Sequence, residues 1–596
     1  MPHREEVPHT IIAKSSMGSH AVEKAWWKEA VVYQIYPASF CDSNGDGLGD
    51  VPGIISKIPY IQSLGADTIW LSPIFASPQH DMGYDISDYR SIHAPYGTVE
   101  DVQKLIDELH SRNMRLLMDL VVNHTSDEHA WFQESRSSRT NPKRDWYFWR
   151  DPKFDLRGNR KEPNNWKSIF GGSAWHFDEK TEQYYLALFL PSQPDLRWAN
   201  ADMREATYDD MRFWLARGVD GFRIDSMNLM SKNEDLPDGK VVNDEPYQDG
   251  SEWFASGPKM HDYIREMRTK VFDTYDAMTV GELGFTKDEQ SVSEYVAKDR
   301  HELNMVFTGD IVDMDFGLHG KYGRDDFHPR KVREITNNWQ TVMPKFDGWN
   351  SVYLDNHDSG RSLSRYASDV PEHRVMAAEM LATYLLTLSG TPFMLAGQEV
   401  GMANLGKEYG IEAYIDVEGR NHYNAVLQAR GGDEFQMADV MRELQLKARD
   451  HGRLPMQWDD TKNAGFTDPD AHPWMTINKD HKDWNVASQV DDPASILSYW
   501  KHMLAFRKKH ADVLVYGSYE PIHESETGEM VLGYRRKHHQ TGETMVVLLN
   551  FSDQEQQVVI KSLDTSKLLT GNQKLRRGSD GSIILEPFGA VVLDNR

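Results

Sequence analysis

Short apolar stretches of strand length recur along most of the chain, and amphipathic segments separate them. The expected strands cover residues 31–36, 68–71, 115–122, 221–224, 278–280, 351–354 and 393–396. Residues 101–113 predict a helix packed on a strand, because apolar residues keep helical spacing there, at Val102, Leu105, Ile106 and Leu109. Apolar strands that alternate with helices are typical of the α/β class, and about eight such units predict a closed (β/α)8 TIM barrel.

Four short strings place acidic or imidazole side chains where an apolar run ends. They are Asp119 to His124, Gly221 to Asp225, Val280 to Leu283 and Tyr353 to Asp358. In a parallel barrel the carboxyl ends of the strands meet at one face, where the site of such barrels is assembled. The strings therefore predict one acidic site at that face.

The regular alternation is interrupted once at length, between residues 125 and 195. This stretch is rich in Trp, Asn, Gly and charge, and its size predicts a small inserted domain that overhangs the site. Its tryptophans are expected to form the core of that insert, and stacking on a sugar is the alternative for Trp146, Trp149, Trp166 and Trp175. After residue 516, short alternating strands near 530–534, 544–551 and 582–585 predict a C-terminal antiparallel β-sandwich.

A chain of 596 residues is too long for one compact core, so several domains are expected. We expect a flexible N-terminal extension, a barrel in two segments, the inserted domain and the β-sandwich. Their expected ranges are 1–25 for the extension, 26–124 with 196–515 for the barrel, 125–195 for the insert and 516–596 for the sandwich.

The charge balance narrows the range of partners. Lys and Arg total 66 against 92 Asp and Glu, a net charge of −26, which argues against nucleic acid or an anionic membrane as a partner. Cys41 is the single cysteine, so an intrachain disulfide is impossible and a reducing compartment is favoured, with Cys41 a small buried residue. No apolar run approaches the roughly 20 residues that span a bilayer, and no signal-peptide block is evident. We expect a cytoplasmic protein, monomeric or alternatively dimeric, that binds a small neutral molecule.

Eight strings in fixed order resemble the α-amylase superfamily, glycoside hydrolase family 13. Within it, the chain most resembles the oligo-1,6-glucosidases and the fungal maltases and isomaltases, from about Trp26 to the C-terminus. The strings are Gln34 to Pro37, Asp42 to Asp50, Gly83 to Ile86, Asp119 to His124, Gly221 to Asp225, Gly281-Glu282, Asn356 to Asp358 and Arg453 to Trp458.

The resemblance implies a catalytic role for three carboxyl groups. Asp225 would be the nucleophile, Glu282 the acid and then the base, and Asp358 a third carboxylate that holds the substrate. Retaining hydrolysis needs a nucleophile and a proton donor about 5 to 5.5 Å apart. Arg223 lies on the same strand face as Asp225 and would favour its ionised form, whereas neighbouring negative charge should raise the pKa of Glu282.

The resemblance also implies the substrate contacts. His124 and His357 would bind sugar hydroxyls, and a pair of Asp81 with Arg453 would close the pocket over the non-reducing glucose. A closed pocket predicts exo cleavage, which releases α-glucose from short oligosaccharides. The remaining implied contacts are Tyr84 as a stacking platform and Phe170 and Gln193 in the walls.

A loop near the N-terminus offers oxygen ligands at alternate positions, as hard cations require. In the family this loop holds one Ca²⁺ or Mg²⁺, so we expect a structural ion, and no organic cofactor. An EF-hand is excluded because its twelfth position is Gly53, and a turn without an ion is the alternative. The expected ligands are Asp42, Asn44, Asp46, Asp50 and the Leu48 carbonyl.

Ser226, which follows the implied nucleophile, bears on the linkage that is cleaved. Relatives that favour α-1,6 bonds tend to have Val there, and those that favour α-1,4 bonds tend to have Thr or Ala. Serine is small and polar, so we expect maltose-type α-1,4 substrates and also sucrose, with isomaltase or transglucosylase activity as alternatives. The Arg-Leu-Asp-Arg-Asp loop of the sucrose isomerases is not found. A non-catalytic role, as in transporter-associated relatives, is disfavoured because all three acids are present.

Overall fold

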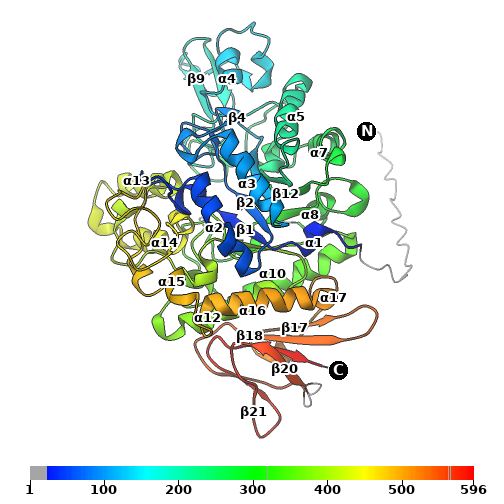
Figure 1. Cartoon of the computed structure of the whole chain (residues 1–596). Helices are drawn as coiled ribbons and strands as arrows, with labels where there is room; N and C mark the ends of the chain where they lie inside the picture. Colours follow the sequence, from blue (N-terminus) through cyan, green and yellow to red (C-terminus); the bar gives the residue numbers. More distant parts are fainter. Residues whose placement is uncertain (1–22, 287, 319, 561–562, 564–565, 596) are drawn as a thin grey trace, which may run out of the picture.

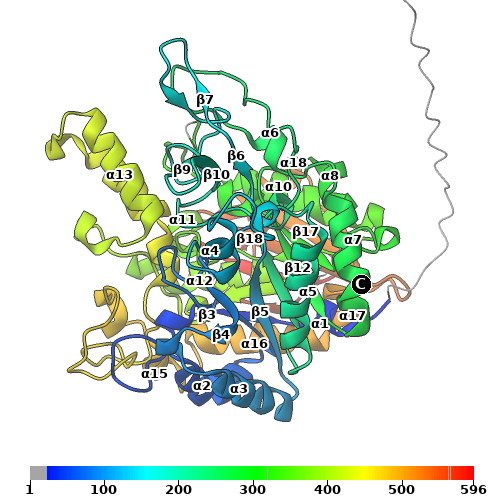
Figure 2. The ribbon, with the colours of Figure 1, turned by 90° about the horizontal axis from the view of Figure 1, so that it is seen from above.

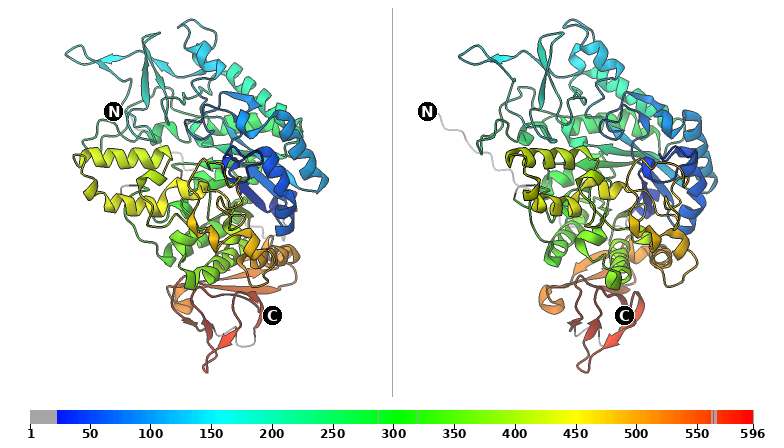
Figure 3. Two further views of the ribbon diagram at one scale, coloured as in Figure 1. Left: turned by 60° about the vertical axis from the view of Figure 1, so that its left-hand side comes forward. Right: turned by 90° about the vertical axis from the view of Figure 1, so that its left-hand side faces the viewer.

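The computed structural model describes residues 23–286, 288–318, 320–560, 563 and 566–595. The expected N-terminal extension therefore lies outside the described residues except for its last three positions. The inserted segment and the C-terminal sheets lie at opposite ends of the molecule, with the barrel between them (Figures 1 and 3).

Eight parallel strands form the predicted barrel, in the order β13-β12-β11-β5-β2-β1-β15-β14. The register is continuous through the centre, where Arg223 of β11 pairs with Asp119 of β5 and with Val280 of β12. In chain order the strands are β1 Val32–Ile35, β2 Thr68–Leu71, β5 Arg115–Val121, β11 Gly221–Asp225, β12 Met278–Leu283, β13 Met305–Thr308, β14 Ser351–Val352 and β15 Thr391–Leu395.

The barrel is nearly closed, and side chains bridge its seam. Within the described residues β13 and β14 share no strand pairing, but Ser351 Oγ donates to the Val306 carbonyl at 2.7 Å. The Tyr353 hydroxyl donates to the Thr308 carbonyl, also at 2.7 Å. The sequence pattern missed β13 because four residues bounded by polar segments give too little periodicity.

Helices cover the outside of the barrel. Helix α3 begins and ends two residues earlier than the predicted range of 101–113. It starts at a capping box, in which Thr98 accepts from the Asp101 amide and Asp101 accepts from the Thr98 amide. All four of its predicted apolar residues are buried. The covering helices are α2 Val51–Leu64, α3 Val99–Ser111, α5 Ala201–Leu215, α7 Met260–Lys270, α8 Glu289–Glu294, α10 Pro329–Val342, α12 Pro371–Thr387 and α16 Ile496–Lys509.

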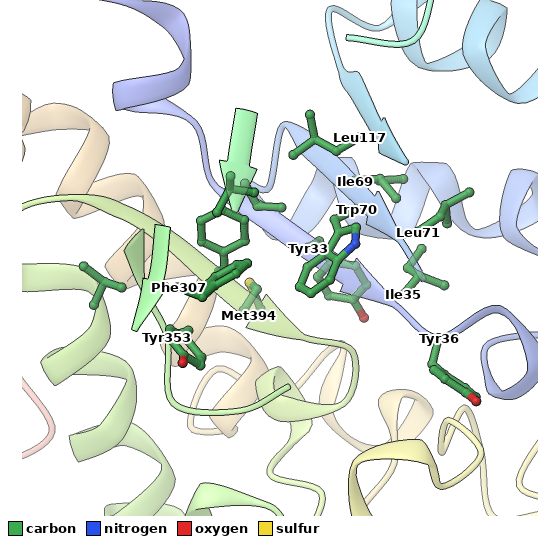
Figure 4. Packing of buried hydrophobic residues seen from close by; sticks show 14 of the residues in the cluster. Tyr33, Ile35, Tyr36, Ile69, Trp70, Leu71, Leu117, Phe307, Tyr353 and Met394 are labelled. Atoms are coloured by element: carbon green, nitrogen blue, oxygen red, sulfur yellow. The ribbon is translucent and has the colours of Figure 1, made fainter. Parts of the chain in front are cut away.

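Aromatic rings fill the barrel interior beneath the carboxyl ends of the strands. Trp70 stacks on Phe307 with ring centroids 5.6 Å apart, and Phe307 meets Tyr353 edge-on at 5.0 Å (Figure 4). Phe393 of β15 packs against the same ring at 4.7 Å. This dry packing gives the polar residues above it a rigid floor.

The insert contains a three-stranded antiparallel sheet, made of β6 Trp149–Arg150, β9 Trp175–Asp178 and β10 Gln183–Leu186, and helix α4 Ala130–Ser135. A separate hairpin of β7 Lys153–Phe154 and β8 Arg160–Lys161 projects from it (Figure 2). The four tryptophans named above, Trp146, Trp149, Trp166 and Trp175, are buried, which favours the core interpretation over sugar stacking.

The C-terminal region folds into two antiparallel sheets around a separate apolar core. The first sheet contains β16 Ser518–Pro521, β17 Val531–Lys537, β18 Thr544–Asn550, β23 Ala590–Asp594 and β20 Lys567–Gly571. The second contains β19 Gln556–Val558, β22 Ile583–Leu585 and β21 Arg576–Arg577. Cys41 is buried, as expected. Among the described residues we find no helix with the length and apolar character needed to cross a membrane.

Candidate active site

One buried arginine joins three carboxylates at the carboxyl ends of the central strands. Arg223 Nη1 donates to Asp119 Oδ1 at 2.9 Å and to Asp225 Oδ1 at 2.7 Å. Its Nη2 lies 2.9 Å from Glu282 Oε2. Because Arg223 is 2% exposed, these ion pairs are screened little by water. The strand register therefore places the two acids implied as nucleophile and proton donor around one cation.

A tight turn after β11 completes this arrangement. Ser226 adopts a left-handed conformation with φ 43° and ψ 36°, which is uncommon for a residue other than glycine. Its main-chain amide donates to Glu282 Oε2 at 3.0 Å. The turn thus brings a second donor to the carboxylate that Arg223 already holds.

Burial and neighbouring charges set the protonation of Glu282. Burial raises its pKa to about 7, with Arg223 opposing the shift and the charges of Asp225 and Asp358 adding to it. The direction that the sequence predicted is therefore correct, although burial rather than charge is the larger cause. Burial likewise raises the pKa of Asp119 to about 7 against the influence of Arg223.

His357 and Tyr84 form a coplanar pair beside these acids. Their ring centroids are 5.3 Å apart and the planes 6° from parallel, and with the Tyr84 hydroxyl 2.5 Å from His357 Nε2 the two rings lie edge to edge. Gln34 lies 2.8 Å from His357 Nδ1 as a donor, which leaves the proton on Nε2, 2.5 Å from the Tyr84 hydroxyl. That hydroxyl donates in turn to Asp119 Oδ2 at 3.1 Å. The chain of hydrogen bonds fixes the ring plane of both residues.

Asp358 lies where two arginines meet. Its Oδ1 is 2.9 Å from Arg449 Nε and 3.0 Å from Arg453 Nη2. Although burial opposes ionisation, these neighbours and His357 hold the pKa of Asp358 well below its usual range. Asp358 is therefore a permanent anion, unlike Glu282.

The predicted pairing of Asp81 with Arg453 is wrong. The arginine opposite Asp81 is Arg449, whose Nη2 is 3.6 Å from Asp81 Oδ1, while Arg453 binds Asp416 at 2.7 Å and the His357 carbonyl at 2.8 Å. Both arginines belong to the 3₁₀ helix η11 Arg449–Arg453, where a separation of four residues turns them to different sides. Arg449 was missed, although a second arginine just before the recognised string was a visible signal.

A cavity of about 170 Å³ unites most of the predicted site residues. Its lining comprises Asp81, Tyr84, His124, Ile169, Phe170, Phe189, Asp225, Ser226, Glu282, Lys321, Asp358, Glu418 and Arg449. Gln193 and His357 are buried behind this wall, where Gln193 donates to Asp81 Oδ2 at 2.9 Å. Sequence reasoning missed Lys321, from a loop, and Glu418, from the first turn of helix α13 Val417–Ala429. Neither belongs to a recognised string, and the two pair at 2.7 Å.

A buried lysine links the insert to the barrel beside His124. Lys232 Nζ lies 2.8 Å from Asp195 Oδ2 and donates to Asn123 Oδ1 at 2.9 Å. Asn123 Nδ2 lies 3.3 Å from His124 Nδ1, and His124 Nε2 lies 3.1 Å from the Tyr84 carbonyl. The ion pair therefore fixes the start and the end of the insert and, through Asn123, the orientation of the histidine.

Comparison with known proteins agrees with this geometry. The family profile described as "Alpha amylase, catalytic domain" matches residues 34–517. The chain belongs to the α-amylase family. An α-glucosidase of Schizosaccharomyces pombe is 42% identical over 578 residues, 96% of this chain and 99% of that protein. An oligo-1,6-glucosidase of Parageobacillus thermoglucosidasius is 45% identical over 532 residues, 89% and 91% of the two chains.

A solved structure extends the agreement to the fold. Trehalose-6-phosphate hydrolase of Bacillus licheniformis superposes with a TM-score of 0.88 at 39% identity, covering 96% of this chain and 100% of that chain. The resemblance inferred from eight short strings is therefore confirmed at the level of the family and the barrel.

In the loop predicted to hold a cation, residues 42–50, the aspartate side chains accept hydrogen bonds from nearby main-chain amides. Asp42 accepts from the amides of Gly45 and Gly47 at 2.8 and 2.7 Å, and Asp50 accepts from the Gly53 amide at 2.6 Å, which caps α2. The all-oxygen donor set fits a hard cation. However, among the described residues no three acidic, imidazole or thiol groups gather as a metal cluster, so the ion remains a prediction.

Replacing Arg223 with methionine should destabilise the protein in a pH-dependent manner. Without the guanidinium, the already raised pKa values of Asp119 and Glu282 rise further, so the folded state disfavours their ionised forms. The free energy of unfolding should fall by about 3 to 5 kcal/mol above pH 7. The decrease should be smaller at about pH 5.5, because Asp119 and Glu282 are then largely protonated in the folded state whether or not Arg223 is present. Thermal unfolding at both pH values measures it.

Arg157→Met is the matched control, because Arg157 is fully exposed on the β7–β8 hairpin. It should leave both unfolding midpoints close to those of the parent. An equal loss for Arg223→Met at the two pH values would contradict the proposed electrostatic role.

Proposed function

We propose that this protein is a retaining, exo-acting α-glucosidase that removes glucose from the non-reducing end of short oligosaccharides. The observation that carries the proposal is the small cavity that Asp225, Glu282 and Asp358 line together. We place its closed end at Asp81 and Arg449, which line the same cavity and lie 3.6 Å apart. A closed end admits one terminal sugar and excludes the interior of a long chain. The relatives named α-glucosidase and oligo-1,6-glucosidase support the same activity.

Two displacements at one carbon account for the reaction. The Asp225 carboxylate attacks the anomeric carbon while Glu282 donates its proton to the departing oxygen, which leaves a glucosyl ester on Asp225. Glu282 then takes a proton from water, whose oxygen attacks the same carbon and frees Asp225. A carboxyl group with a pKa of about 7 holds enough proton to begin the cycle near neutral pH and accepts one readily afterwards.

The other residues of the cavity orient the sugar. We assign His124, His357 and the ionised Asp358 to its hydroxyl groups, because each presents polar atoms at the cavity or directly behind its wall. The aromatic face of Tyr84 suits the C–H face of a pyranose. Phe170 and Phe189 extend this apolar wall from the insert, with ring centroids 5.6 Å apart. These residues bind and orient the sugar, but they take no part in making or breaking bonds.

The stereochemistry of the product tests the proposal. Because two inversions restore the configuration, the glucose first formed from p-nitrophenyl α-glucoside, whose leaving group is not a sugar, should be the α anomer, observed by proton NMR before mutarotation. Asp225→Asn should lower turnover by several orders of magnitude, about 10⁴-fold or more, because the nucleophile is lost.

Asp276→Asn, at an exposed aspartate of the same barrel, should keep the parent activity. Circular dichroism of both variants controls for folding. β-Glucose as the first product, or an Asp225→Asn variant with near-parent turnover, would overturn the mechanism.

Linkage preference is assigned to Ser226, which lies in the cavity lining next to Asp225. Ser226→Val should shift the ratio of kcat/KM for maltose over isomaltose towards isomaltose by about 10- to 200-fold, because the branched side chain crowds an α-1,4-linked second glucose. The measurement is the pair of initial-rate constants on the two disaccharides.

Ser226→Ala is the matched control, since it removes the hydroxyl without adding bulk. Its ratio should stay much closer to the parent value than that of the valine variant. Valine also disfavours the left-handed conformation at this position, so thermal stability is measured alongside. A valine variant whose ratio stays within about twofold of the parent would move linkage selection elsewhere.

The loop of residues 42–50 is proposed to bind Ca²⁺ or Mg²⁺ as a structural ion. A chelator should then lower the thermal unfolding midpoint, because an ion at about 100 times its dissociation constant stabilises a fold by about 2.7 kcal/mol. Asp46→Ala should abolish that response, since Asp46 is exposed and its carboxylate accepts from the Leu48 amide within the loop, so its loss removes an ion ligand with little other packing. An unchanged midpoint of the parent with chelator would refute the site.

A further inference from the structure

A second cavity continues from the first on the far side of Glu282. It has a volume of about 320 Å³ and shares Ile169, Glu282, Lys321, Asp358 and Glu418 with the smaller cavity. Because the two cavities share Glu282, a group bonded to the reacting carbon on the side away from Asp81 and Arg449 would extend into the larger one. It is therefore the place of the leaving group and of any acceptor that replaces water.

Two apolar side chains that line the larger cavity are exposed to solvent. Phe285 is 51% exposed and Ile169 is 37% exposed, although both line a functional cavity. They come from different segments, since Ile169 belongs to the insert and Phe285 follows β12. The remaining apolar lining residues are Leu283, Val312, Phe316 and the barrel aromatics Trp70, Phe307, Tyr353 and Phe393.

The Phe285 ring is held in this exposed position by buried aromatic residues. Its centroid is 5.5 Å from that of Phe254 in an edge-on contact, and Phe254 meets the fully buried Trp166 at 5.5 Å. The backbone of Phe285 is left-handed with φ 61°, a costly conformation for a bulky residue. An exposed ring that is braced at its edge offers a preorganised surface for another ring.

We propose that the glucosyl-enzyme transfers its glucose to aromatic primary alcohols bound against Phe285 and Ile169. The inference rests on the proposed α-glucosidase function and names a second acceptor class for the same site. In the transfer, the alcohol oxygen forms a bond to the anomeric carbon as the bond to the Asp225 carboxylate breaks. The hydroxyl proton passes to Glu282, and the electron pair of the broken bond returns to Asp225.

Competition between two alcohols tests the inference directly. The protein is given p-nitrophenyl α-glucoside as donor, with benzyl alcohol and glycerol at equal concentration as acceptors. Released p-nitrophenol counts all turnovers, and chromatography separates glucose, benzyl glucoside and glyceryl glucoside. The parent should form at least about fivefold more benzyl glucoside than glyceryl glucoside, because only benzyl alcohol stacks on the exposed ring.

Phe285→Ser should lower that product ratio by about fivefold, and Ile169→Ser should lower it in the same direction. The ratio compares two fates of one glucosyl-enzyme, so it does not depend on the total activity of a variant. Phe154→Ser is the matched control, because Phe154 is 65% exposed on the β7–β8 hairpin and lines neither cavity. It should keep the parent ratio.

The outcomes separate this inference from the proposed function. A parent that releases no p-nitrophenol would contradict the α-glucosidase activity itself. A parent that releases p-nitrophenol and glucose but glucosylates glycerol as well as benzyl alcohol would overturn only the acceptor preference. The same conclusion follows if the ratio is unchanged in both Phe285→Ser and Ile169→Ser.

Discussion

The site depends on one ionic arrangement, the binding of a single guanidinium to carboxylates from neighbouring strands. Arg223 contacts Asp119 on β5, Asp225 on its own strand and Glu282 on β12. Three carboxylates this close would repel one another in a dry interior, and the cation offsets part of that cost. The parallel register makes the arrangement possible, because neighbouring strands deliver side chains to the same level at the carboxyl face.

The same burial gives neighbouring acids different protonation. The pKa of Glu282 is raised to about 7, because the effect of burial outweighs that of Arg223. The pKa of Asp358 stays well below its usual range beside His357, Arg449 and Arg453. The neighbours of each buried acid, Arg223 for Glu282 and His357 with two arginines for Asp358, therefore decide which one carries a proton near neutral pH. That separation is what general acid catalysis requires of two carboxyl groups in one cavity.

Much of the barrel could be predicted because its signals are local. Apolar runs located seven strands, and the strings at their ends located the carboxylates, since parallel topology alone brings strand ends together. The misses concern long-range contacts. Strand β13 is too short to show a period, and the choice between Arg449 and Arg453 depends on the rotation of a 3₁₀ helix. Lys232 carries no motif, and its role is apparent only when Asn123 and Asp195 converge on it.

The reacting groups and many of the residues that surround the substrate come from different parts of the fold. The reacting groups lie on strands or directly after them, where the aromatic floor around Trp70 and Phe307 leaves them little freedom. Loops and the insert add further lining residues to each cavity, and Ile169 of the insert contributes to both. Because the insert is anchored through Lys232 beside His124, changes in its outer loop can alter what enters without moving the carboxylates. Acceptor choice can therefore change in this fold while the bond chemistry stays the same.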